Sequence, residues 1–276
     1  MTRFKKLSIP YLIWMIILVI FPMIVMVVLS FLDSNGFDLQ GSSFTFDNFK
    51  ELGNDTYVTA FIDSMEFSFI ATVICLLIGY PIAYIISSSK ITNKYLVLLI
   101  FILPMWTNML LRLKALRELA MPKGFMMNVF GVSLNLFGTE EKSTILVILG
   151  MIIMYLPFMI FPIYTVLEKI EPSLLEASQD LGANKFKSFI KVTLPLSLKG
   201  VTSGVIMVFL PCAMGFTISY VLSGGQIQLI GNIIEKFFKL DNNYNLGSLI
   251  SLIIIILVIG SLFIISRVDE KGETLL

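Results

Sequence analysis

Six long stretches of mostly apolar residues constrain this chain more than any other feature of its sequence. A helix of about 20 apolar residues spans the hydrocarbon core of a bilayer, and in lipid only helices and closed barrels satisfy all their backbone hydrogen bonds. The chain is 57% apolar and 14% charged, with a mean hydropathy of +0.89, well outside the soluble range. The sequence therefore predicts an all-α, polytopic membrane helix bundle. Its predicted spans are 11–32, 65–87, 95–112, 144–167, 200–222 and 247–266.

The charged residues and the cysteines give no indication of nucleic-acid binding, of a disulfide or of a metal site. The formal net charge is +1 and there is no long basic run, so nothing indicates binding to nucleic acid. The two cysteines, Cys75 and Cys212, lie within apolar stretches and are interpreted as small core residues. No disulfide and no metal site is therefore predicted.

The first predicted span follows Arg3, Lys5 and Lys6 and therefore has the start of a secretory signal. Its apolar region is too long for a signal peptide, and it ends without the small residues of a cleavage site. We expect this segment to remain as a membrane anchor.

The distribution of basic residues predicts how the chain is oriented in the cell membrane, which is the plasma membrane or the inner membrane. If both termini are cytoplasmic, the cytoplasmic segments contain 12 of the 20 lysines and arginines, in keeping with the positive-inside rule. The basic group Arg112, Lys114 and Arg117, after the third span, is a local exception. This topology places the polar segment from Glu168 to Lys199, between spans four and five, in the cytoplasm.

Five of the six predicted spans contain proline. A proline frees a backbone carbonyl that neighbouring helices must satisfy, so kinked spans favour a packed bundle with an interior, as a transporter needs. Proline is also more frequent in membrane helices than in soluble ones, which is the alternative explanation.

The 168–199 segment, called the elbow below, is far longer than a turn between two spans needs. Pro172 and Ser173 are expected to open a helix, and Ser173 and Glu176 have the spacing of a capping box. Gly182 is suited to the left-handed turn that ends a helix. One face of this helix is expected to carry Leu174, Leu175, Ser178 and Leu181.

A second short helix is expected after Gly182, with Pro195 marking the return toward the fifth span. Its apolar side is predicted to hold Phe186, Phe189, Ile190 and Leu194, and another side Lys187 and Lys191. Such a helix pair can dock a partner protein, or it can rest in the headgroups with its lysines facing anionic lipid. Periodicity alone leaves both possibilities open.

The spacing within the elbow is more specific. Glu176-Ala177-Ser178 is followed after three residues by Gly182, and after nine more by Val192-Thr193-Leu194-Pro195. This pattern resembles the cytoplasmic loop signature of binding-protein-dependent ABC importer permeases, which reads E-A-A, three positions, G, nine positions, I-x-L-P. Ser178 stands where the signature has alanine and Val192 where it has isoleucine, and neither replacement alters the sequence of helix, bend and helix.

Segments elsewhere resemble the spermidine/putrescine permeases, most closely their B-type subunit, so that the resemblance covers nearly the whole chain. These segments are Phe44–Phe49, Gly79–Tyr84, Leu103–Asn108 with Leu111-Arg112, and Leu229–Ile234. The chain departs from that group at Leu113-Lys114-Ala115-Leu116, where the group usually has Thr-Tyr-Ala-Trp.

The resemblance implies the six-span, type I ABC importer permease (MetI-like) fold. Residues 1–64 would form an N-terminal cytoplasmic tail, the first span and an external loop. Residues 65–266 would form the permease core of five spans with the 168–199 loop, and residues 267–276 a cytoplasmic C-terminal tail.

The resemblance also implies a division of labour among several chains, of which this one lies in the lipid bilayer. The partners would be two ATPase subunits, a second homologous permease and an external substrate-binding protein. The sequence contains no G-x-x-x-x-G-K-[ST] phosphate loop and no histidine, so we expect neither enzyme activity nor a cofactor in this chain. ATP and Mg would be used by the partner ATPase.

Coupling to the ATPase is assigned by the resemblance to six elbow residues: Glu176, Ala177, Ser178, Gly182, Leu194 and Pro195. Closure of the ATPase dimer is expected to move the elbow as a rigid body and to turn spans four and five between inward-facing and outward-facing states. Glu176 would accept a charge-assisted hydrogen bond from the ATPase, or cap its own helix.

A polyamine carries several ammonium groups, so its pathway should offer carboxylates, carbonyls or aromatic faces. The candidates are Asp63, Glu66, Trp106, Asn108, Tyr155 and Tyr164. Each has a plainer explanation: the two acids can be solvated charges at a helix end, and Trp106 can fill a contact between helices.

Three alternatives remain at this point. The same fold could import iron, phosphate, thiamine, a phosphonate or another organic cation, because specificity is shared with the external binding protein. A carrier driven by an ion gradient is disfavoured, since the middle parts of the spans contain no Asp, Glu or His. A membrane scaffold could use the elbow to recruit a soluble partner without transporting anything.

Overall fold

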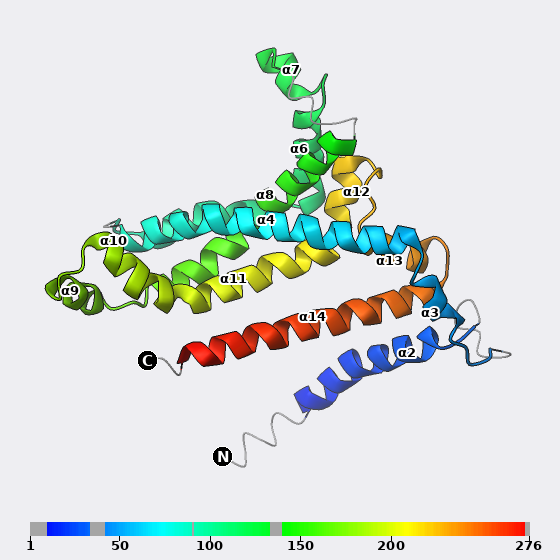
Figure 1. The fold of residues 1–276 in the computed structure, drawn as a ribbon. Helices are drawn as coiled ribbons and strands as arrows, with labels where there is room; N and C mark the ends of the chain where they lie inside the picture. The colour runs from blue at the N-terminus through cyan, green and yellow to red at the C-terminus, as the bar shows by residue number, and fades with distance from the viewer. Residues whose placement is uncertain (1–9, 34–41, 90, 133–139, 274–276) are drawn as a thin grey trace. The chain divides into compact units, whose positions relative to one another are not determined.

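A computed structural model describes residues 10–33, 42–89, 91–132 and 140–273 (Figure 1). Within these ranges the chain is helical, and its only β interaction is an isolated antiparallel bridge between Leu32 and Phe44. The prediction of an all-α protein is confirmed. The chain divides into two compact units: Met1–Ala60 with Gly231–Ser261, and Phe61–Ile230 with Leu262–Leu276.

The described helical elements follow one another in chain order. They are η1 (Ile16–Ile20), α2 (Phe21–Ser30), α3 (Asp47–Glu51), α4 (Asp55–Ser88), α5 (Lys94–Ile102), η2 (Leu103–Trp106), α6 (Met109–Ala120), α7 (Phe125–Phe130), α8 (Glu140–Leu167), α9 (Pro172–Asp180), α10 (Lys185–Ser188), η3 (Phe189–Thr193), α11 (Leu194–Met214), α12 (Thr217–Ser223), α13 (Ile230–Lys239) and α14 (Tyr244–Glu273). The elements η1 and η3 are π-helices, and η2 is a 3-10 helix.

The core of the larger unit is organised around the packing of α8 against α11. A Cβ atom on Gly200 would lie 2.9 Å from the carbonyl oxygen of Pro162 and 3.0 Å from Cα of Ile163. A Cβ atom on Gly204 would lie 2.8 Å from Sδ of Met159. Two glycines four residues apart thus let the two backbones approach closely, as in other membrane helix pairs.

α4 approaches α8 through a glycine of its own. A Cβ atom on Gly79 would lie 3.0 Å from Cγ of Met159. Next to it, Cys75 is fully buried, and its Sγ lies 3.9 Å from the carbonyl oxygen of Ile152. Cys75 and Cys212 are both free thiols in the hydrophobic core, as predicted.

The third predicted span, 95–112, is not one helix. The apolar helical segment Lys94–Trp106 bends by 90° into α6. The cause is local, because the Oδ1 atom of Asn108 accepts hydrogen bonds from the backbone N–H groups of Leu110 (2.9 Å) and Leu111 (3.4 Å) and so caps a new helix. The predicted span is therefore interrupted after Trp106.

The fifth predicted span, 200–222, also has different bounds. The helical run that contains α11 begins at Lys185 and ends at Met214. Gly215 is extended, with φ −70° and ψ 129°, and α12 starts as a separate helix at Thr217. A proline at 211 followed by a glycine at 215 ends the helix inside the apolar stretch.

Four described helices are long and apolar enough to cross a membrane: Pro10–Ser30, Asp55–Ser88, Ser143–Leu167 and Lys185–Met214. The bent pair at Trp106 makes a fifth if it counts as one span, and Tyr244–Gly260 is a shorter apolar helix. The prediction of a polytopic membrane bundle is confirmed, whereas the count of six spans is not.

In the smaller unit, two asparagine side chains cap the end of α2. Asn48 donates from Nδ2 to the carbonyl oxygens of Ser30 (3.0 Å) and Leu32 (2.9 Å). Asn245, which is buried, donates from Nδ2 to those of Leu29 (3.0 Å) and Leu32 (2.7 Å). The last carbonyls of a helix lack partners within the helix, so these amides tie the first apolar helix to α3 and α14.

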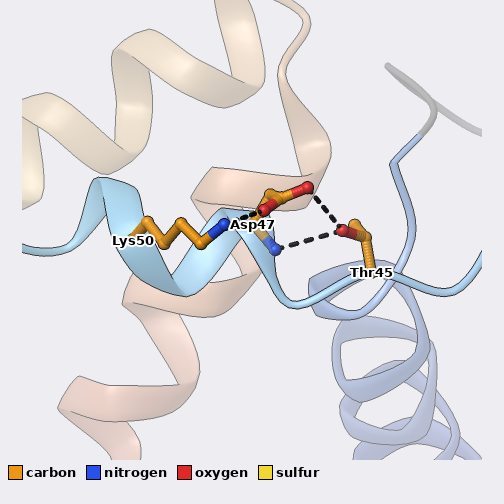
Figure 2. Close-up of polar contacts among 3 residues, drawn as sticks. All are labelled: Thr45, Asp47 and Lys50. Carbon is orange, nitrogen blue, oxygen red and sulfur yellow. Dashed lines mark hydrogen bonds and ion pairs between the residues drawn. The ribbon is translucent and has the colours of Figure 1, made fainter.

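Figure 2 shows the polar contacts at the start of α3. Thr45 Oγ1 accepts a hydrogen bond from the N–H of Asp47 (3.1 Å) and donates to Asp47 Oδ2 (3.0 Å), and Lys50 Nζ lies 2.6 Å from Asp47 Oδ1. The bonds from Lys50 and then Thr45 hold the pKa of Asp47 below its ordinary value. Because Asp47 and Lys50 are exposed and Thr45 is only half-buried, these contacts fix the first turn of α3 without adding much stability.

Gly200→Ala is expected to destabilise the protein, although alanine ordinarily stabilises a helix interior by about 1 kcal/mol relative to glycine. The new methyl group would meet backbone atoms of α8 that cannot move aside, at a cost of roughly 1–3 kcal/mol. Thermal unfolding in detergent should show a lower Tm. The matched control is Gly260→Ala, where no atom lies within 4 Å of the added Cβ. Equal Tm values for both variants would contradict the close packing.

Candidate functional site

The first helix of the elbow, α9, begins at Pro172, as predicted. Proline suits the first helical position because its missing N–H would be unpaired there in any residue. The predicted capping box is wrong, because Glu171 is the N-cap residue, without a side-chain cap, and Ser173 lies inside the helix. Ser173 Oγ lies 3.3 Å from Glu171 Oε2, and Glu176 is exposed.

The bend after α9 is formed by Gly182, which has a φ of +83°. Its N–H donates to the carbonyl oxygen of Gln179 (2.8 Å), and the N–H of Ala183 donates to that of Ser178 (3.0 Å). These two bonds form a Schellman motif, in which glycine takes the left-handed position. The predicted role of Gly182 in the bend is confirmed.

A hydrogen bond between two serines holds the two halves of the elbow together. Ser178 Oγ lies 2.7 Å from Ser188 Oγ and 2.7 Å from the carbonyl oxygen of Leu175. A hydroxyl group has one proton, so Ser188 donates to Ser178 when Ser178 donates to Leu175. Ser188 is buried. The serine that replaces the third alanine of the signature therefore joins α9 to α10.

The second half of the elbow is not a separate helix. α10, η3 and α11 form one helical run from Lys185 to Met214, so the predicted return at Pro195 is wrong. Pro195 lies in the first turn of α11, directly after the π-helix η3. A proline ring clashes with the carbonyl four residues before it. The wider π-turn lets the chain continue through the proline without a break.

The π-turn also changes which apolar side chains share a face. Phe189 is half-buried, with its ring centroid 5.2 Å from that of Tyr84 and 6.0 Å from that of Tyr80. Phe186 is 70% exposed and Ile190 is also exposed. The prediction of one common apolar side is therefore wrong.

The elbow presents several apolar side chains at its surface. On α9 and its C-terminal turn, Leu175 and Ser178 are half-buried, whereas Leu174 is exposed and Leu181 is 90% exposed. The exposed apolar residues of the elbow are Leu174, Leu181, Phe186 and Ile190. Leu194 is half-buried, and Ala177 and Pro195 are exposed. The elbow thus has an apolar surface next to its exposed lysines.

The predicted pathway residues come from three parts of the larger unit. On α4, Asp63 is half-buried and Glu66 is exposed. At the bend between η2 and α6, Trp106 is 79% exposed and Asn108 caps α6. A pathway role for these four residues stays a prediction.

The two tyrosines lie at different levels of α8. Tyr155 and Tyr164 are nine residues apart, which is about 13 Å along a helix. Tyr164 is buried in the hydrophobic core, whereas the hydroxyl of Tyr155 lies 3.7 Å from where a Cβ would stand on Gly215. Tyr155 therefore lies at the break between α11 and α12, a feature that the sequence analysis did not predict.

A contact between the elbow and α4 was also missed. Tyr80 Oη lies 2.9 Å from Ser197 Oγ, close to the Phe189 ring. Ser197 Oγ donates to the carbonyl oxygen of Leu194 (2.9 Å), so Tyr80 donates to Ser197. Tyr80 and Ser197 are more than 100 positions apart in the chain, so their contact leaves no local pattern. The sequence indicates only that Tyr80 and Tyr84, about one helical turn apart, lie on one face of α4.

Comparisons with known proteins bear on this arrangement. Residues 79–268 match the family described as binding-protein-dependent transport system inner membrane component. The spermidine/putrescine transport system permease protein PotB of Haemophilus influenzae is 35% identical over 277 residues, which cover 97% of this chain and 95% of that protein. PotB of Escherichia coli K12 is 32% identical over 248 residues, covering 89% and 90%.

Solved structures share the fold. A bacterial ABC transporter involved in the import of the acidic polysaccharide alginate has a TM-score of 0.73 and 18% identity, covering 98% of this chain and 95% of that chain. An amino acid ABC transporter with histidines has a TM-score of 0.53 and 16% identity, covering 83% and 100%. The predicted importer permease fold is confirmed.

Gly182→Val is expected to loosen the elbow, because a β-branched residue in the left-handed conformation costs about 1–2 kcal/mol. Local opening would then rise about tenfold, and trypsin should cleave faster after Lys185 and Lys187. Gly182→Asn is the control, since asparagine tolerates this conformation. If both variants were cleaved at the rate of the unaltered protein, the left-handed turn would not limit opening.

Proposed function

Because the chain belongs to the family of binding-protein-dependent transport system inner membrane components, we propose that it is the permease subunit of an ATP-driven polyamine importer. The observation that carries this proposal is the identity of 35% to a spermidine/putrescine permease over 97% of the chain. The apolar helices and the permease relatives make it a multi-pass membrane protein. Both termini would lie in the cytoplasm, as the basic residues indicate.

Hydrolysis of ATP with Mg would take place on a separate protein, because this chain has no phosphate loop. Two copies of that ATPase would bind below a pair of permeases, this chain and a homologous second one. An external binding protein would deliver the cargo. One structural relative was solved in complex with a periplasmic protein bound to an alginate pentasaccharide, which supports such an arrangement for the fold.

The elbow would be the part of this chain that docks on the ATPase. Its exposed apolar residues would fill an apolar groove there, and Glu176 would accept a charge-assisted hydrogen bond from a cation of the partner. Gly182 and the bond between Ser178 and Ser188 would keep both halves of the elbow in one shape. A push on α9 would thus reach α10, and with it α11.

The cargo is proposed to be spermidine or putrescine. Ammonium groups would be received by acids and aromatic faces, and Trp106, with its exposed ring at the bend between η2 and α6, is the best placed of the predicted candidates. Asn108 would act mainly through its cap on α6. The other proposed pathway residues are Asp63, Glu66, Tyr155 and Tyr164. Of these four, Tyr164 is the least exposed.

Glu176→Lys should reduce uptake and co-purification of the ATPase at least tenfold, because a charged hydrogen bond is replaced by a repulsion. The control is Glu171→Lys, the same charge reversal on an exposed residue of the elbow outside the signature. The measurements are uptake into vesicles and the stoichiometry of the purified complex. Unchanged association in Glu176→Lys would refute the docking role.

Polyamines should stimulate the ATPase activity of the complete complex in the presence of its binding protein, whereas iron, thiamine and phosphonates should not. Uptake should also survive an uncoupler while ATP remains. Trp106→Ala should raise the KM for spermidine about fivefold through loss of a cation–π contact. Trp14→Ala, which removes an exposed ring from the first apolar helix, is the control. Stimulation by a different solute alone would exclude the polyamine cargo.

A further inference from the structure

Three of the described helices are attached to the elbow, two of them covalently. α8 leads into it and α11 leads out of it. The third attachment is the set of side-chain contacts to α4, in which the Phe189 ring packs against Tyr80 and Tyr84 and Tyr80 donates a hydrogen bond to Ser197. We call these four residues the clasp. Because the clasp is non-covalent, substitutions can release α4 from the elbow without cutting the chain.

α4 holds a second segment at its opposite end. Ser64, which is fully buried, accepts a hydrogen bond of 2.8 Å at its Oγ from the N–H of Ile230. Leu229 and Ile230 are themselves buried. This bond fixes the connection between α12 and α13 against α4. Ser64 and Tyr80 are 16 residues apart, or about 24 Å along the helix.

The part of α4 between these two contacts can transmit a displacement. It is α-helical without interruption from Ser64 to Tyr80, and Pro81 lies beyond it on the side of the elbow. The hydroxyl groups of Ser68 and Thr72 return to the carbonyl oxygens four residues before them, so neither hydroxyl needs a partner on another helix. Gly79 packs directly on α8.

We propose that α4 acts as a lever that carries the movement of the elbow to the Leu229–Ile230 segment on the opposite side of the membrane. Displacement of α9 passes through the bond between Ser178 and Ser188 to Phe189, and the clasp passes it to α4. The other end of α4 then moves Ile230 through Ser64. The clasp residues are positioning residues, and the inference rests on the proposed docking of the elbow on an ATPase.

The test uses the complete complex in proteoliposomes, with Gln228→Cys as a reporter beside Leu229. Residue 228 is exposed, whereas both native cysteines are buried, so a membrane-impermeant maleimide should label only the introduced thiol. Labelling is measured with and without ATP and vanadate, alongside uptake per ATP hydrolysed. In the otherwise unaltered complex the labelling rate should depend on the nucleotide.

Phe189→Ala should abolish the nucleotide dependence of labelling and lower uptake per ATP about tenfold, through loss of the ring contacts. Tyr80→Phe should lower uptake per ATP about fivefold, through loss of one hydrogen bond. Ser197→Ala combined with Tyr80→Phe should be no worse than either alone, because both remove the same bond. ATPase association and basal hydrolysis should persist, which a merely unfolded variant would not show.

The controls remove the same chemical groups at exposed positions. They are Tyr95→Phe on α5 and Phe69→Ala on α4. If the clasp variants kept the nucleotide dependence of labelling and the full uptake per ATP, the lever would be refuted while the docking of the elbow would stand. If instead the unaltered chain bound no ATPase, the proposed function itself would fail. If Phe189→Ala did not assemble, Tyr80→Phe, which keeps the ring, would decide.

Discussion

The close approach of α8 and α11 is the constraint on which the rest of the larger unit depends. Lipid tails solvate apolar side chains as well as another helix does, so hydrophobicity alone does not choose a partner for either helix. Gly200 and Gly204 make the choice, because only a bare backbone fits against Pro162 and Met159. Since α8 enters the elbow and α11 leaves it, this contact also fixes the spacing at the base of the elbow.

Features that depend on short-range chemistry could be predicted from the sequence. Pro172 opens a helix and Gly182 closes it because their backbone preferences act within one turn. The capping box failed by the same logic, since the proline already occupies the first helical position and leaves Ser173 inside. The cap that Asn108 forms on α6 could have been predicted, because an asparagine stands there between an apolar stretch and a basic amphipathic one. It was missed because most of the residues on both sides of Asn108 are apolar.

Features that depend on distant partners could not be predicted. Ser178 was interpreted as a conservative replacement, and only the fold shows that it meets Ser188 across the bend. The contact of Phe189 with Tyr80 and Tyr84 joins residues more than 100 positions apart. The π-turn that orients the Phe189 ring has no recognisable pattern of apolar residues in the sequence. The break at Gly215 lies within an apolar stretch that continues on both sides of it. Local patterns thus predicted the helix start and the bend of the elbow, whereas its contacts with the rest of the bundle depend on packing.

The π-turn at Phe189–Thr193 has a consequence for how this region tolerates change in evolution. Such a turn is equivalent to an α-helix with one inserted residue, and one residue corresponds to about 100° of rotation. Deleting a single residue there would restore regular geometry while swinging everything upstream, including Phe186, around the axis of α11. Insertions and deletions should therefore be purged from this turn more strictly than substitutions, whatever the identity of the side chains.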